Sequence, residues 1–127
     1  MNIKNIKPFE ILLSWQQHLN EKNLSAVLKL YDISCVLIPT FSSEILTDQE
    51  QIKEYFVKVI EVQKGKVEFQ PNSISEQQVG EIMYLLSGKY FFHLMEKEKI
   101  PARFSFLVNI LSENPILHHH SSRSISN

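Results

Sequence analysis

The spacing of the hydrophobic residues in this 127-residue chain changes near Gly65, and that change restricts the folds open to it. Before Gly65 the apolar side chains recur every three or four residues, which predicts helices. After Gly65 they alternate with polar side chains, which predicts strands. Helices followed by consecutive antiparallel strands are typical of the α+β class, in which one curved sheet buries a face against helices. We therefore expect a single α+β domain over residues 1–127, with a frayed tail from about residue 123.

The first half of the chain predicts three helices and one short strand. Apolar stripes over residues 9–19 and 24–31 predict two helices separated by a polar break, the second capped by Asn23. Residues 34–38 are β-branched and apolar and run into Pro39, which predicts a strand that enters a loop. Thr47 and Glu50 form a capping-box pattern for a third helix, which places five apolar residues on one face: Ile52, Tyr55, Phe56, Val59 and Ile60.

The second half of the chain predicts a meander of strands. Alternation covers residues 67–69, 81–94 and 102–111, and a last strand is expected over residues 116–122. Polar breaks at residues 96–99 and 112–115 have the length and composition of hairpin connections. The sheet is therefore expected to be antiparallel.

Composition and charge exclude several classes of function. The formal net charge is -1, which gives no electrostatic basis for nucleic acid or an anionic membrane as the main partner. Cys35 is the single cysteine, so no intramolecular disulfide is expected, and a reducing compartment fits. Residues 1–15 interrupt their apolar residues with charges and a proline, unlike a signal peptide, and no apolar run approaches the roughly 20 residues that cross a bilayer. We expect a soluble, cytoplasmic protein.

The order of the expected elements, together with several short motifs, resembles the nuclear transport factor 2-like (SnoaL-like) superfamily. The similarity is carried by Trp15, Leu24, Leu30-Tyr31, Ile52, Tyr55-Phe56, Ile100-Pro101-Ala102-Arg103-Phe104-Ser105-Phe106 and His119-His120-Ser121-Ser122. Within the superfamily, the sequence is most similar to small bacterial proteins related to the association domain of calcium/calmodulin-dependent protein kinase II. The resemblance implies a cone-shaped α+β fold whose curved antiparallel sheet and three helices enclose a pocket. It also implies a homodimer formed through the sheet.

Some members of this superfamily are enzymes, and two positions bear on that activity. In the ketosteroid-isomerase branch, a tyrosine on the first helix donates a hydrogen bond to the developing oxyanion, and an aspartate after the first strand abstracts the proton. The matching positions of this sequence hold Trp15 and Pro39. Because proline supplies no base, we expect no ketosteroid isomerisation. An enzyme of another SnoaL-like type, an isomerase or an oxidoreductase, is the alternative.

Arg103 is the first candidate for a ligand contact. Alternation separates Arg103 and Ser105 from the phenylalanines of their strand, which fits either a solvent-facing arginine or one that lines a pocket. In the kinase association domains, an arginine at the matching position lines the pocket and receives a carboxylate, for which a planar bidentate donor is suited. The resemblance implies that Arg103 forms the polar floor of the pocket, with His119 and Ser121 beside it.

The run His118-His119-His120 is the other candidate cluster. Alternation places His118 and His120 on one face of the strand and His119 on the other. Two histidines about 7 Å apart on a strand could share a metal, but a zinc site needs three or four ligands. We therefore predict no metal site, and histidines bonded to their neighbours are the competing interpretation. The glycines are isolated, so no phosphate-binding loop and no cofactor are predicted.

We interpret the chain as a stand-alone small-molecule-binding domain in a homodimer, with a small carboxylate as the expected ligand. Trp15 and Tyr90 are placed at the cavity by the resemblance. An enzyme, or a pure oligomerisation module that uses the exposed sheet face, are the alternatives. If the helices cover only one side of the sheet, the alternating aromatic face of residues 102–110 is too apolar to be left in water, so it is expected to pair with a second copy.

Overall fold

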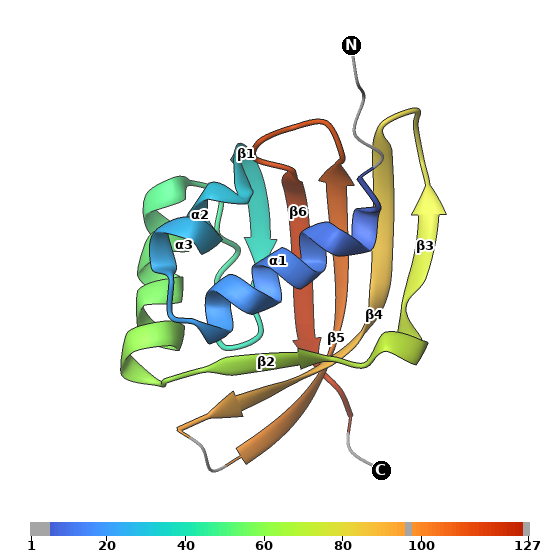
Figure 1. Ribbon diagram of the computed structural model, residues 1–127. Helices are drawn as coiled ribbons and strands as arrows, with labels where there is room; N and C mark the ends of the chain where they lie inside the picture. The colour runs from blue at the N-terminus through green and yellow to red at the C-terminus, as the bar shows by residue number, and fades with distance from the viewer. Residues whose placement is uncertain (1–5, 96–97, 126–127) are drawn as a thin grey trace.

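Three helices cover one face of a curved sheet in the computed structural model, which describes residues 6–95 and 98–125 (Figure 1). The first five residues, the first two residues of the expected 96–99 connection and the last two residues of the tail lie outside the described residues. The helices precede five of the six strands, so the α+β class is confirmed. Among the described helices, none has the length and apolar character needed to cross a membrane.

The first two helices form where the apolar spacing predicts them. Helix α1 spans Pro8–Asn20, and the proline at its start has no N–H to leave unbonded. Its buried face consists of Ile11, Leu12, Trp15 and Leu19 together with Pro8. Helix α2 spans Leu24–Lys29, and the Asn23 side chain accepts a hydrogen bond from the Ala26 N–H at 3.2 Å, so the expected cap is confirmed.

The start of the third helix differs from the expected capping box. Helix α3 spans Gln49–Val57 and is capped by Asp48, which accepts a hydrogen bond from the Gln51 N–H at 2.8 Å. The Gln51 side chain in turn accepts from the Thr47 N–H at 2.9 Å. Aspartate satisfies an unpaired N–H as well as threonine does, so the cap lies one residue later than predicted. The helix continues as a π-helix, η1, over Lys58–Val62, a wider turn often found at functional sites.

The six strands form one mixed sheet in the order β1-β6-β5-β4-β2, with β3 paired to β4. Their bounds are Tyr31–Ile38 (β1), Lys66–Phe69 (β2), Ser75–Gln78 (β3), Met83–Leu94 (β4), Glu98–Asn109 (β5) and Ile116–Arg123 (β6). The meander β4-β5-β6 is antiparallel, as predicted, but β1 pairs with β6 in parallel. No hairpin joins β1 to β6, so no local feature of the sequence indicates their relative direction.

Several boundaries differ from the expected ones for identifiable reasons. Strand β3 and the 3₁₀ turn η2 (Pro71–Ser73) were not expected, because all four residues of β3 are exposed and polar. Strand β1 begins at Tyr31, which the helical spacing had placed on the second helix. Strand β6 continues through Arg123, and the Ser124 N–H bonds to the Pro101 carbonyl at 2.9 Å. The tail is therefore held beyond the point where fraying was expected.

The apolar side of β5 is buried within the chain. Phe104, Phe106 and Val108 are at most 4% exposed, and the ring of Trp15 from α1 lies 5.3 Å from the ring of Phe106. The expectation that this side pairs with a second copy is therefore wrong, because α1 of the same chain covers it. The side of β5 left open carries residues of the other parity, including Arg103.

Candidate functional site

A continuous line of hydrogen bonds between six side chains crosses the core. The Trp15 Nε1–H donates to Tyr31 Oη at 3.0 Å, and Tyr31 Oη bonds to His119 Nδ1 at 2.9 Å. His119 Nε2 bonds to Tyr90 Oη at 3.1 Å, and Tyr90 donates to Ser121 Oγ at 2.6 Å. Ser121 Oγ is bonded to Thr40 Oγ1. We call these six residues the polar chain: Trp15, Tyr31, His119, Tyr90, Ser121 and Thr40.

Four secondary-structure elements and one loop supply the polar chain. Helix α1 brings Trp15, strand β1 begins with Tyr31, and the loop after β1 carries Thr40. Strand β4 brings Tyr90, and β6 supplies His119 and Ser121. Aromatic packing fixes the rings, because His119 stacks on Phe106 with ring centroids 3.8 Å apart, and Trp15 stacks on Tyr90 at 5.9 Å.

The polar chain consists of uncharged groups at neutral pH. Burial lowers the pKa of His119 well below its ordinary value of 6.5, and the neighbouring histidines add to this effect. Burial also raises the pKa of Tyr31 and of Tyr90 above 10, although the hydrogen bond from Tyr90 to Ser121 opposes this shift. His119 is therefore a neutral imidazole whose two nitrogens are both hydrogen-bonded.

The polar chain borders a small cavity inside the cone. This inner cavity has a volume of about 10 Å³, close to the space that one water molecule needs. Its wall combines polar-chain residues with apolar ones: Trp15, Leu37, Pro39, Thr40, Tyr55, Phe56, Val59, Tyr90, Phe92, His119 and Ser121.

A second cavity, of about 330 Å³, lies between α3, η1 and the loop after β1, and we call it the vestibule. Tyr55 and Val59 line both the vestibule and the inner cavity, so they form the partition between them. The Tyr55 Oη accepts a long hydrogen bond, 3.4 Å, from the Phe41 N–H, and burial raises the pKa of Tyr55 to about 12. The Tyr55 side chain therefore separates the two cavities, and its contact to Phe41 is weak because it is long.

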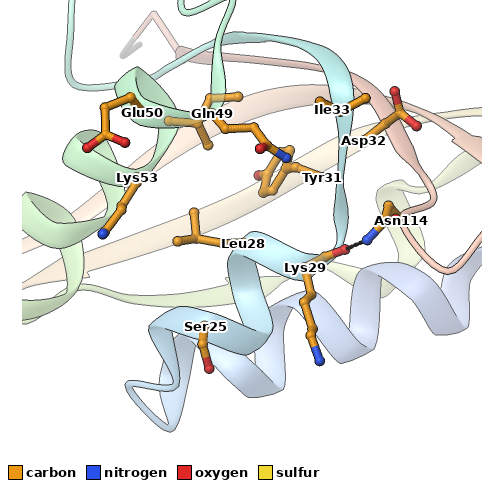
Figure 2. Close-up of a pocket in the computed structure, with 11 residues that line it drawn as sticks. Ser25, Leu28, Lys29, Tyr31, Asp32, Ile33, Gln49, Glu50, Lys53 and Asn114 are labelled. Carbon is orange, nitrogen blue, oxygen red and sulfur yellow. Dashed lines mark hydrogen bonds between the residues drawn. The ribbon is translucent and has the colours of Figure 1, made fainter.

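A third hollow is a surface groove of about 710 Å³ between α2, β1 and α3 (Figure 2). Figure 2 shows Lys29 on α2 and Gln49, Glu50 and Lys53 on α3 around it, with Leu28 between them. Most of its polar groups are exposed to water, in contrast to the buried polar groups of the inner cavity. We therefore place the candidate site at the inner cavity, although it is smaller.

Four of the five residues expected at the ligand site lie together in the structure. Trp15, Tyr90, His119 and Ser121 all line the inner cavity. The fifth, Arg103, does not, and the expected polar floor formed by its guanidinium is wrong.

The reason lies in the pairing of β5 with β6. Directly opposed residues of an antiparallel pair point to the same face of the sheet, and Phe104 is opposite Ser121 whereas Arg103 is opposite Ser122. Arg103 is therefore exposed on the outer face, where it lines a shallow depression with His120 and Ser122. The alternation of the three histidines is as expected, with His119 buried and His120 exposed.

Sequence reasoning missed three residues of the site. Tyr31 was assigned to the apolar stripe of a helix, Tyr55 to the core face of α3, and Thr40 was not singled out. A threonine directly after the strand-ending Pro39 was the one local signal available. Among the described residues, no group of three metal-ligating side chains comes together.

Comparison with solved structures identifies the fold. No family model matches the sequence, and no curated protein matches it. A protein from Xanthomonas campestris, provisionally named a calcium/calmodulin dependent protein kinase II association domain, superposes with a TM-score of 0.82 at 24% identity, covering 100% of this chain and 95% of that one. A nuclear transport factor 2-like protein of unknown function from Shewanella oneidensis gives 0.72 at 17% identity, over 90% and 94% of the two chains.

A third neighbour comes from Streptomyces avermitilis and is provisionally named a dehydratase of the nuclear transport factor 2-like family. It superposes with a TM-score of 0.78 at 6% identity, covering 93% of this chain and 94% of that one. This chain therefore has the nuclear transport factor 2-like fold, as the sequence predicted. Identities this low establish the fold and leave the ligand and the reaction to be argued from the site itself.

Removing one hydroxyl from the polar chain should destabilise the fold. Tyr31→Phe leaves the Trp15 N–H and His119 Nδ1 without their partner in the core, which we expect to lower the free energy of unfolding by about 2 to 4 kcal/mol. Tyr84→Phe is the matched control, since Tyr84 is a half-buried tyrosine outside the polar chain. Urea unfolding of both variants checks this, and equal stabilities would show that the polar chain contributes nothing.

The stability of the fold should also decrease on mild acidification. Below about pH 6.5 the unfolded chain takes up a proton at His119, whereas the folded chain does not until its much lower pKa is reached. The contribution of His119 is therefore fully present above pH 6.5 and decreases by about 1.4 kcal/mol per pH unit below it. Urea unfolding between pH 7.5 and 5.5 should give a shallower slope for His119→Gln than for the wild type. His120→Gln, on the outer face, is the control, and a wild-type slope in His119→Gln would contradict this interpretation.

Proposed function

We propose that this chain is a small-molecule-binding domain whose ligand reaches the inner cavity and extends into the vestibule. The observation that carries the proposal is the polar chain, a line of buried, mutually bonded side chains that ends at a cavity wall. Apolar side chains would fill such a core without the cost of desolvating polar groups. A few oriented polar groups in an otherwise apolar cavity are typical of ligand sites.

The sizes of the two cavities suit a ligand with a small head group and a larger body. The inner cavity, at about 10 Å³, admits one small group such as a single oxygen atom. The vestibule, at about 330 Å³, lies within the range of small-molecule sites and would hold the body. Rotation of the Tyr55 side chain would join the two, at the expense of its long bond to Phe41.

Binding without turnover is the function that the cavity supports best. None of the described side chains that line the inner cavity is a carboxylate, and the position where an isomerase base would lie holds Pro39. His119 has both ring nitrogens engaged in hydrogen bonds, so a proton transfer through it would first have to break one of them. The dehydratase name of one structural neighbour describes that protein and suggests a reaction only for it.

Ligand binding can be followed at Trp15, which is the single tryptophan of the chain and begins the polar chain. The test is a titration with four small cyclohexane derivatives: cyclohexanone, cyclohexylamine, cyclohexanecarboxylate and methylcyclohexane. Binding is measured as a saturable shift of the Trp15 indole N–H resonance. At least one should bind, and Tyr55→Ala should bind it more tightly, by about threefold or more, because the partition is removed. Tyr84→Ala is the control and should retain wild-type affinity. The absence of a saturable shift with all four compounds in both wild type and Tyr55→Ala would reject the function and favour an assembly module.

The homodimer remains part of the proposal, formed by the outer face of the sheet. No helix of the described chain covers this face, and half-buried apolar side chains lie on it between polar ones: Leu85, Phe91, Pro101 and Leu107. In a two-fold contact each copy would present the same patch to the other. This pairing uses the face opposite to the one first expected from the phenylalanines of β5.

A charge placed in this patch should separate the copies. We expect sedimentation of the wild type to give twice the chain mass of 14.8 kDa and Leu107→Glu to shift it toward the monomer. Leu111→Glu changes an exposed leucine just beyond the end of β5 and should leave the dimer intact. A wild-type mass of 14.8 kDa that does not change with concentration would exclude the dimer.

A further inference from the structure

We propose that the inner cavity recognises an uncharged molecule through a hydrogen-bond acceptor, such as a ketone or aldehyde oxygen, and excludes carboxylates. This inference rests on the proposed function and adds the chemical class of the ligand. Two features support it: the direction of the hydrogen bonds along the polar chain and the charges around the vestibule.

The direction of the polar chain is fixed at Trp15, because an indole N–H donates and cannot accept. Tyr31 therefore accepts from Trp15 and gives its own proton to His119 Nδ1. A neutral imidazole with Nδ1 as acceptor carries its proton on Nε2, which donates to Tyr90. The single proton of Tyr90 goes on to Ser121. Each of these residues donates the single proton that it carries to the next residue. All the hydrogen bonds from Trp15 to Ser121 are therefore donated in the direction of the cavity.

The end of the polar chain is therefore left with a proton to donate. Ser121 already accepts from Tyr90, and the bond between Ser121 and Thr40 uses one of their two hydroxyl protons. Both hydroxyls line the inner cavity, and the Tyr55 hydroxyl lies on the same wall. Wherever this series ends among the three, the last hydroxyl keeps a proton to donate toward the cavity. An acceptor atom of a ligand completes the series, whereas a purely apolar head leaves that proton unbonded.

The charges around the site disfavour an anion. The inner cavity contains no cationic side chain among its described lining residues, and His119 stays neutral because of its burial. The vestibule carries two carboxylates, Glu44 and Glu54, against one ammonium group, Lys58. A carboxylate would give up its hydration there and meet no partner of opposite charge in the inner cavity. The carboxylate ligand expected from Arg103 is thus replaced by a neutral one, since Arg103 lies on the outer face.

Three probes of similar size separate the possibilities: cyclohexanone, cyclohexanecarboxylate and methylcyclohexane. We expect cyclohexanone to shift the Trp15 indole resonance with an affinity about three- to tenfold higher than that of methylcyclohexane, the increment of one neutral hydrogen bond. Cyclohexanecarboxylate should bind more weakly than cyclohexanone. If the wild type binds too weakly to rank the three probes, the ranking can be measured in Tyr55→Ala, which lacks the partition between the two cavities. The same order of affinities is expected there.

Variants of the last hydroxyls test the cause of the preference. Ser121→Ala combined with Thr40→Val removes both hydroxyls at the end of the polar chain, so it should reduce the preference for cyclohexanone over methylcyclohexane. Thr40→Val alone leaves the Ser121 proton free to donate and should retain that preference. Ser105→Ala removes a hydroxyl from the outer face and should change neither affinity. Equal or tighter binding of cyclohexanecarboxylate or methylcyclohexane would overturn the ligand class while the proposed function stands. Failure of every probe with wild type and with Tyr55→Ala would overturn both.

Discussion

The burial of one donor, the Trp15 indole N–H, sets the arrangement of the whole interior. The indole lies in the core with no access to water, so its N–H requires an acceptor, and Tyr31 provides it. Once Tyr31 accepts, His119 and Tyr90 each have a single way to satisfy their own proton. The histidine tautomer, the orientation of Tyr90 and the acceptor role of Ser121 all follow from this first bond. The polar groups of the core are thus ordered by one residue of the first helix.

The parallel pairing of β1 with β6 allows this arrangement to reach the cavity. Tyr31 opens β1 and Thr40 follows its end, and both reach side chains on β6, His119 and Ser121. Between Tyr31 and Val36 the register shifts, because five residue steps along β1 match only two along β6. Because of this bulge, the two ends of β1, Tyr31 and Ile38, pair with positions only four residues apart on β6, Ile116 and His120.

The two faces of the sheet carry different kinds of polar side chain. The inner face holds uncharged polar groups within an apolar wall, and the outer face holds the charged residues of the same strands, such as Arg103 and Lys89. A ligand inside the cone therefore meets hydrogen-bond donors and aromatic rings, whereas the charged groups remain available to a partner or to solvent. The vestibule lies beside the inner cavity and is lined by Tyr55 and by residues of the π-helix that follows α3.

The sequence by itself determined the elements of this fold, since helical and alternating spacing are local properties that burial imposes on each segment. It also placed Trp15, Tyr90, His119 and Ser121 at the cavity through the resemblance. Tertiary structure alone decided that Arg103 faces outward, that β1 runs parallel to β6, and that Tyr31 and Thr40 join the site. Alternation of polar and apolar residues separates the two faces of one strand. It does not determine which side chains of the neighbouring strand lie on the same face of the sheet. That match depends on the register between strands, which is fixed by packing of the whole sheet against the helices.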